Sequence, residues 1–112
     1  MAYDRELAER IRGVLPNEPV AEKAMFGGLA FLVGGHMALA SSGKGGLMVR
    51  CEPADSDRLL TEPGASRMEM GGRQPDGWLR VTSEAVADDD VLAEWVRIGT
   101  SYAGSLPPKS PK

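Results

Sequence analysis

The chain has 112 residues, of which 42% are hydrophobic and 26% charged, so its length and composition predict one globular domain and exclude an extensively disordered chain. Its formal net charge of -3 argues against a dedicated duplex-DNA binder, because such proteins carry a basic surplus that neutralises phosphates. No apolar run approaches the ~20 residues that a membrane-spanning helix needs, so we expect no membrane association.

The N-terminal half predicts one helix and four short strands. Apolar residues recur at helical spacing after Asp4, a suitable N-cap, and Pro16 ends this helix because the residue before a proline avoids helical backbone angles. Alternating apolar residues punctuated by glycine then predict strands at 20–25, 29–33, 36–40 and 47–51. Gly34 and Gly35 are typical of a two-residue hairpin turn.

The C-terminal half predicts a short helix at 54–61, strands at 67–70 and 78–81, and a long helix at 88–106. The tail 107–112 is expected to be disordered, which leaves 1–106 as the domain. Hairpin-linked strands pair antiparallel, and helices in such folds gather on one face. The sequence therefore predicts an α+β domain with an antiparallel sheet of about five to six strands, in the order helix, four strands, helix, two strands, helix.

The segment 23–51 contains no carboxylate, and its second and third strands are apolar on both faces. An antiparallel sheet with one wet face normally alternates apolar and polar residues, and this hairpin does not. If the Gly-Gly turn alone sets the register, Phe31 faces Ala38 and Leu29 faces Ala40. One face would then carry Leu29, Phe31, Val33, His36, Ala38 and Ala40, and the other Ala30, Leu32, Met37 and Leu39.

A chain this short has enough helix to cover only one face of this hairpin. We therefore expect the other face to be covered by a second copy of the chain, in a homodimer, or by another protein. A loop or a chain terminus is the alternative cover. The sequence does not tell which face the helices take, so the predicted interface residues come from both: Leu29, Ala30, Phe31, Leu32, Val33, Met37, Ala38 and Leu39.

Lys44, Arg50 and Arg73 lie in or near the acid-free segment and are a candidate anion site, with scattered solvated charges as the alternative. Arg50 is the strongest of the three, because a strand holds a side chain more rigidly than a loop does. The turn around Lys44 is not a P-loop, because Gly35 lies too far back and a strand follows instead of a helix.

No catalytic, metal or cofactor motif is recognisable. His36, the only histidine, fits an exposed hairpin tip, and Cys51, the only cysteine, fits a small buried thiol and a reducing cytoplasm. The acidic run 88–90 fits a helix N-terminus, where the helix dipole stabilises carboxylates, better than a cation site. We therefore expect a protein that is not an enzyme and that needs no metal or cofactor.

Several motifs, in their order, resemble the TfoX (Sxy) N-terminal domain family. The segment 25–37 reads MFGGLAFLVGGHM and is the most specific of them; Gly77-Trp78 and the closing segment DVLAEWVRIGTSYAGSLPPK add to it. The similarity covers nearly the whole chain. It implies an α+β domain, no catalytic residue, and a link to bacterial transcription regulation, since the best-known members promote natural competence. Those members add a second, helical domain, so the chain resembles a stand-alone member.

Residues and resemblance together predict a non-enzymatic regulatory or protein-interaction domain that acts as a small homodimer. The alternative is a small-ligand or anion-binding domain that uses Lys44, Arg50 and Arg73.

Overall fold

The computed structural model describes residues 5–15, 20–25, 28–43, 45–69, 72–73 and 76–107. Asp4, Lys44, Met70 and most of the predicted tail therefore lie outside the described residues. Within the described part, six antiparallel strands form one sheet in the order β1-β2-β3-β4-β6-β5. Three α-helices accompany the sheet, so the predicted α+β class and the predicted order of elements are confirmed.

The strands are β1 (Ala21–Met25), β2 (Gly28–Val33), β3 (His36–Ser41), β4 (Leu47–Arg50), β5 (Ala65–Arg67) and β6 (Trp78–Val81). The helices are α1 (Arg5–Val14), α2 (Ser56–Leu59) and α3 (Asp89–Ser105), with short 3₁₀ turns at Pro53–Asp55 and Ala85–Ala87. The strand predicted at 67–70 is misplaced, because β5 begins directly after the Gly64 turn, where Ala65 pairs with Val81 of β6.

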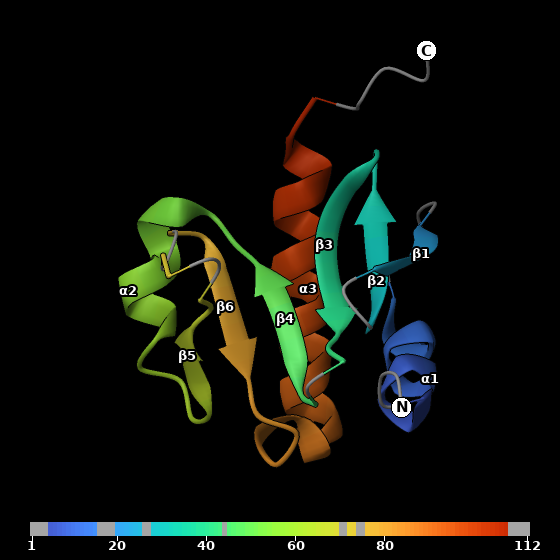
Figure 1. Ribbon diagram of the computed structural model, residues 1–112, viewed down its shortest axis with the longest axis horizontal. Helices are drawn as coiled ribbons and strands as arrows, with labels where there is room; N and C mark the ends of the chain where they lie inside the picture. Colours follow the sequence, from blue (N-terminus) through green and yellow to red (C-terminus); the bar gives the residue numbers. More distant parts are fainter. Residues whose placement is uncertain are drawn as a thin grey trace.

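Helices α1 and α3 cover one face of the sheet, and α3 passes behind β3 and β4 in Figure 1. The i,i+4 spacing of Leu7 and Ile11 gives α1 one apolar side, and both residues are buried against the sheet and α3. The buried strand residues of this main core are Leu29, Phe31, Val33, Ala38, Leu39, Leu47, Val49, Leu79 and Val81. The predicted placement of helices on one face is therefore confirmed.

The β2–β3 hairpin turns at Gly34 and Gly35, as predicted, and Val33 pairs with His36. Both glycines have positive φ angles, 60° and 84°, which other residues rarely adopt. Such angles are those of the type I′ turn, whose twist matches that of the two flanking strands.

A β-bulge in this hairpin corrects the predicted faces. The register shifts between Phe31 and Leu32, so Phe31 pairs with Leu39. A bulge adds one residue to one strand, and here Ala38 and Leu39 both reach the main core while Ala40 turns to the other face. The two predicted pairs, Phe31 with Ala38 and Leu29 with Ala40, are therefore wrong.

Gly99 allows α3 to cross β3 at close range. A Cβ atom built on Gly99 would lie only 2.5 Å from the carbonyl oxygen of Ala38, the extra residue of the bulge. The helix and the bulged strand therefore meet where α3 has no room for a side chain larger than that of glycine. This close contact places α3 against one face of the sheet, so α3 does not cover the opposite face.

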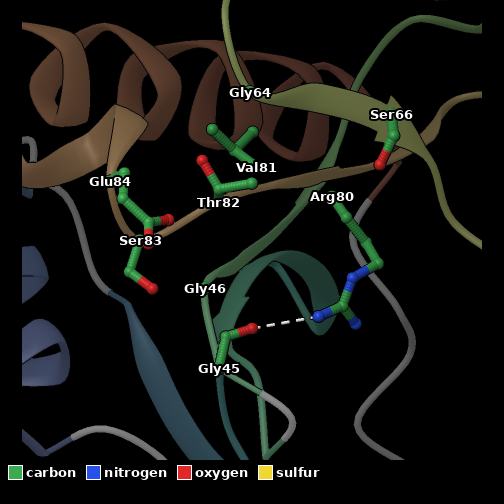
Figure 2. Close-up of a pocket in the computed structure, with 9 residues that line it drawn as sticks. All are labelled: Gly45, Gly46, Gly64, Ser66, Arg80, Val81, Thr82, Ser83 and Glu84. Carbon is green, nitrogen blue, oxygen red and sulfur yellow. Dashed lines mark hydrogen bonds between the residues drawn. The ribbon is translucent and has the colours of Figure 1, made fainter.

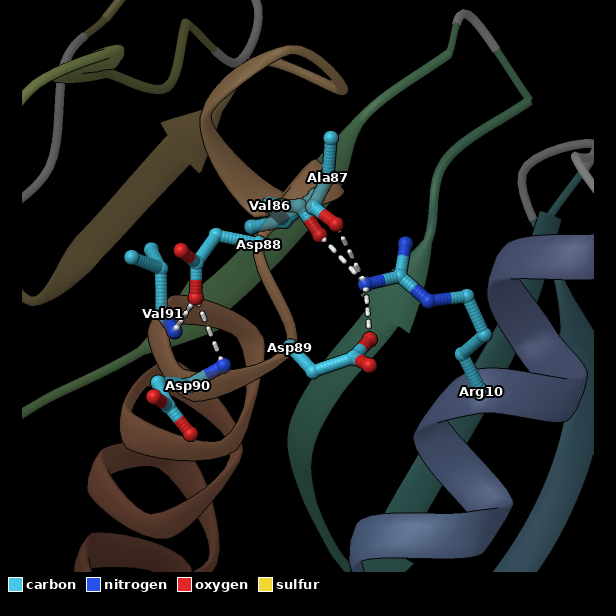
Figure 3. Close-up of polar contacts among 7 residues, drawn as sticks. All are labelled: Arg10, Val86, Ala87, Asp88, Asp89, Asp90 and Val91. Atoms are coloured by element: carbon cyan, nitrogen blue, oxygen red, sulfur yellow. Dashed lines mark hydrogen bonds and ion pairs between the residues drawn. The ribbon is translucent and has the colours of Figure 1, made fainter.

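The acidic run at 88–90 serves the N-terminus of α3. Asp88 is the N-cap, and its Oδ1 accepts hydrogen bonds from the backbone N–H groups of Asp90 (2.8 Å) and Val91 (3.3 Å), as Figure 3 shows. These bonds satisfy N–H groups that have no partner within the helix. The interpretation of this run as a helix N-terminus is confirmed.

Arg10 ties α1 to the segment that leads into α3. Its Nη2 donates to the carbonyl oxygens of Val86 (2.8 Å) and Ala87 (3.2 Å) and pairs with Asp89 (2.8 Å), as Figure 3 shows. Two elements at opposite ends of the sequence are thereby joined on the covered side of the sheet.

Candidate functional site

The face of the sheet opposite α1 and α3 carries its own small apolar cluster. We call it the open-face cluster, and it consists of Ala30, Leu32, Met37, Ala40, Met48 and Met68. Strand pairing sets Ala30 beside Ala40 and Ala40 beside Met48. In Figure 1 this is the side of the sheet in front of α3, and none of the described helices lies over it.

The open-face cluster is more sheltered than the sequence indicated. Ala30 is fully buried, and Ala40 and Met48 are only 4% and 6% exposed. The remaining three, Leu32, Met37 and Met68, are half-buried. None of the six residues is fully exposed, so this face is partly sheltered in a single copy, and these three half-buried residues surround a buried centre.

The eight predicted interface residues divide between the two faces. Five are buried in the main core, on the face that α1 and α3 cover: Leu29, Phe31, Val33, Ala38 and Leu39. The other three lie on the open face: Ala30, Leu32 and Met37. The partner interface itself stays a prediction, and the open face is the face of the sheet that the helices leave available for it.

The predicted anion residues are placed differently from one another. Lys44 lies outside the described residues, and Arg73 is exposed. Arg50 ends β4, away from the β3–β4 turn, and its guanidinium carbon lies 5.1 Å from the ring centre of Trp78 and 5.4 Å from that of Tyr102. Cation–π attraction therefore holds Arg50 between a strand and α3. An anion site built on these three residues stays a prediction.

Arg80 is a polar residue of interest that the sequence reasoning missed. It lies in β6, opposite Met48 of β4, and is half-buried. Its Nη2 donates to the carbonyl oxygen of Gly45 (3.0 Å) and its Nη1 to Ser42 Oγ (3.4 Å). The guanidinium therefore reaches the glycine-rich β3–β4 turn.

A cavity of about 230 Å³ opens beside Arg80, between the β3–β4 turn and the residues that follow β6 (Figure 2). Its walls are mostly polar, with hydroxyl groups, backbone and one carboxylate. The lining residues are Gly45, Gly46, Gly64, Ser66, Arg80, Val81, Thr82, Ser83 and Glu84. Such a small polar cavity suits a small charged group better than an apolar ligand.

A wider groove of about 600 Å³ lies between α2 and α3 and has an apolar floor that includes Trp95 and Ile98. Val91, at 37% exposure, is the most exposed large apolar residue in the described part of the chain. Charged residues on its rim pair locally, Arg97 with Glu94 of the same helix turn. Arg58, also on the rim, pairs with Asp55.

Cys51 and His36 do not form a catalytic pair in the structure. Cys51 is 1% exposed, and burial raises the pKa of its thiol, an effect only partly opposed by a hydrogen bond with Ser56. The protonated thiol is a poor nucleophile. His36 lies at the hairpin tip, where its Nε2 donates to the carbonyl oxygen of Pro107 at 2.7 Å.

The described residues contain no group of three or more histidine, cysteine, aspartate or glutamate residues arranged to hold a metal ion. None of their helices combines the length and the apolar character that crossing a bilayer requires.

The molecule is thus a two-layer α+β domain with an apolar open face and a small polar cavity at one end of its sheet. Residues 14–103 match the family model of the TfoX N-terminal domain, which is most of the 112-residue chain. The chain therefore belongs to the TfoX N-terminal domain family. A search of curated proteins found no match.

Proposed function

We propose that the chain is a regulatory protein-interaction domain that forms a homodimer through the open-face cluster. The observation that carries this proposal is the apolar cluster itself, with Leu32, Met37 and Met68 partly exposed on the face that α1 and α3 leave uncovered. The regulatory part rests on the resemblance to competence regulators, whose N-terminal domains share this family.

A second copy suits this face for two reasons. A two-fold axis brings the same patch of both copies together, so an apolar cluster is matched by an apolar cluster. Methionine side chains are flexible, and Met37 and Met68 can adjust to one another across such an axis. The nearby cations are held by their own chain, Arg50 between aromatic rings and Arg80 at the β3–β4 turn, which limits repulsion between copies.

The size of the open face predicts weak association. The cluster extends over five neighbouring strands, from β2 to the residue after β5, and at about 4.8 Å per spacing these strands span roughly 19 Å. Half of the cluster is already buried in one copy. A contact of this width buries less than the roughly 1,600 Å² of a standard interface. We therefore expect a dissociation constant on the order of 10–100 µM, which corresponds to about −6 kcal/mol.

Light scattering over a range of chain concentrations tests the proposal. The wild-type chain should approach twice its 11.9 kDa mass above the dissociation constant, and Met37→Lys should remain a monomer. Val91→Lys is the matched control, because it places the same charge at an exposed apolar residue of α3 and should dimerise as the wild type does. Thermal unfolding would show that both variants fold. A wild-type chain that stays monomeric at millimolar concentration, or a Met37→Lys chain that still dimerises, would refute the proposal.

A further inference from the structure

Arg80 differs from the other half-buried arginines in the described part of the chain. Arg10 and Arg67 each pair with carboxylates, and Arg50 lies between two aromatic rings. Arg80 has neither a carboxylate nor a ring among the described residues. The groups to which it donates, the Gly45 carbonyl oxygen and Ser42 Oγ, are both neutral.

A guanidinium has five N–H donors and a permanent positive charge. Removing such a charge partly from water costs free energy unless an anion compensates it. Neutral acceptors hold the Arg80 side chain in place without supplying that anion. The charge therefore favours an anionic group from outside the described residues, and the cavity beside Arg80 has room for one.

The walls of the cavity supply further hydrogen-bond donors. Ser66 of β5 lies opposite Arg80 of β6, so the two side chains project on the same side of the sheet, and both line the cavity. The hydroxyl oxygen of Thr82 accepts a hydrogen bond from the backbone N–H of Ala85 (3.2 Å), and its own O–H is then a donor for another group. Figure 2 shows these side chains around the cavity, with Arg80 at one end and Glu84 at the other.

Glycines let the β3–β4 turn approach β6 closely and leave the backbone of the cavity wall without side chains. A Cβ atom on Gly46 would lie 2.6 Å from the carbonyl oxygen of Val81, so a side chain there would force the turn away from β6. At Gly45 a Cβ atom would meet nothing within 4 Å, which leaves open space beside the Arg80 contact.

We infer that this cavity binds a small molecule through its phosphate group, with Arg80 as the charged contact and Ser66 as a neighbouring hydroxyl donor. Arginine suits this role because its fork of N–H groups matches the oxygens of a phosphate. The cavity, at about 230 Å³, fits a small phosphorylated compound and not a drug-sized one. Glu84 lines the other end, forms no ion pair with Arg80, and should weaken the binding of any anion. This inference does not rest on the proposed dimer.

A titration of the ¹⁵N-labelled full chain with inorganic phosphate, followed by NMR, tests the inference, with sodium chloride at matched ionic strength as the reference. Phosphate should shift the amide signals of Gly45, Gly46 and Ser66 to saturation, and glycerol phosphate should do so at lower concentration. Acetate binding as tightly as phosphate, or shifts that chloride reproduces, would overturn the assignment.

Three variants sharpen this test. Arg80→Gln should weaken phosphate binding at least tenfold, whereas Arg73→Gln, which removes an exposed arginine that does not line the cavity, should leave it unchanged. Glu84→Gln should strengthen binding about two- to fivefold, because it removes a like charge. This third variant keeps the inference testable if Arg80→Gln does not fold. Binding that is equal in the wild type and in Glu84→Gln, or that survives in a folded Arg80→Gln chain, would contradict the inference.

Discussion

The same substitution, glycine to alanine, should have opposite effects in α3 and α1. In Gly99→Ala the new methyl group would lie 2.5 Å from the carbonyl oxygen of Ala38 and 3.2 Å from its carbonyl carbon. A methyl group has no rotamer that avoids a backbone atom, so α3 must move away from β3. In Gly13→Ala the methyl group would meet nothing within 4 Å.

The magnitudes follow from two competing effects. Alanine is favoured over glycine inside a helix by about 0.8–1 kcal/mol, because glycine loses more backbone entropy on folding. Overpacking a core typically costs about 1–3 kcal/mol, and a contact with fixed backbone belongs at the upper end. Gly99→Ala should therefore lower the free energy of unfolding by about 1–2 kcal/mol. Gly13→Ala, in the last turn of α1, should raise it by about 0.5 kcal/mol.

Urea unfolding followed by circular dichroism measures both changes under the same conditions. The midpoint of Gly99→Ala should fall and that of Gly13→Ala should rise, with similar slopes if only native-state stability changes. For a domain of this size the first change corresponds to a loss of roughly 5–10 °C in melting temperature. A Gly99→Ala chain as stable as the wild type, or more stable, would refute the close crossing of α3 over β3.

Two further predictions concern titratable groups. Because Cys51 is buried and its thiol pKa is raised, a thiol reagent at pH 8 should label the native chain at least about tenfold more slowly than the urea-unfolded chain, and equal rates would contradict its placement. Arg12 donates two hydrogen bonds to Glu22 (2.7 and 2.8 Å), which lowers the Glu22 pKa from its usual 4.5. The stability that this pairing contributes is present above pH 4.5 and is lost as pH falls through the lowered pKa. In the wild type the urea midpoint should therefore fall between about pH 5 and about pH 3, and in Glu22→Gln it should fall less. An equal fall of the midpoint in both chains would contradict the pairing.

Local patterns in the sequence were sufficient to predict most of the helices, strands and turns of the fold. The Gly34-Gly35 turn has its own preferred backbone geometry, and the apolar spacing of α3 identifies a long helix without knowledge of its neighbours. The bulge at Ala38 was missed because strand alternation assumes an unbroken register. A glycine inside α3 was the available signal, since a helix seldom contains Gly99 without a close contact that needs it.

The candidate site was harder to predict because it depends on contacts between distant segments. Arg80 reaches the β3–β4 turn only because β6 pairs with β4, although α2 and β5 separate these two strands in the sequence. Arg50 was expected to bind an anion, and its aromatic partner Tyr102 lies 52 positions further along the chain, so its sequence neighbours gave no sign of that contact.

The proposed association can be tested most directly by an isotope-filtered NOE experiment on a mixture of labelled and unlabelled copies at ~1 mM, well above the expected dissociation constant. The account predicts NOEs between copies at the methyl groups of Leu32, Met37 and Met68. Their absence, or NOEs between copies that involve only α3 and its groove with α2, would contradict it.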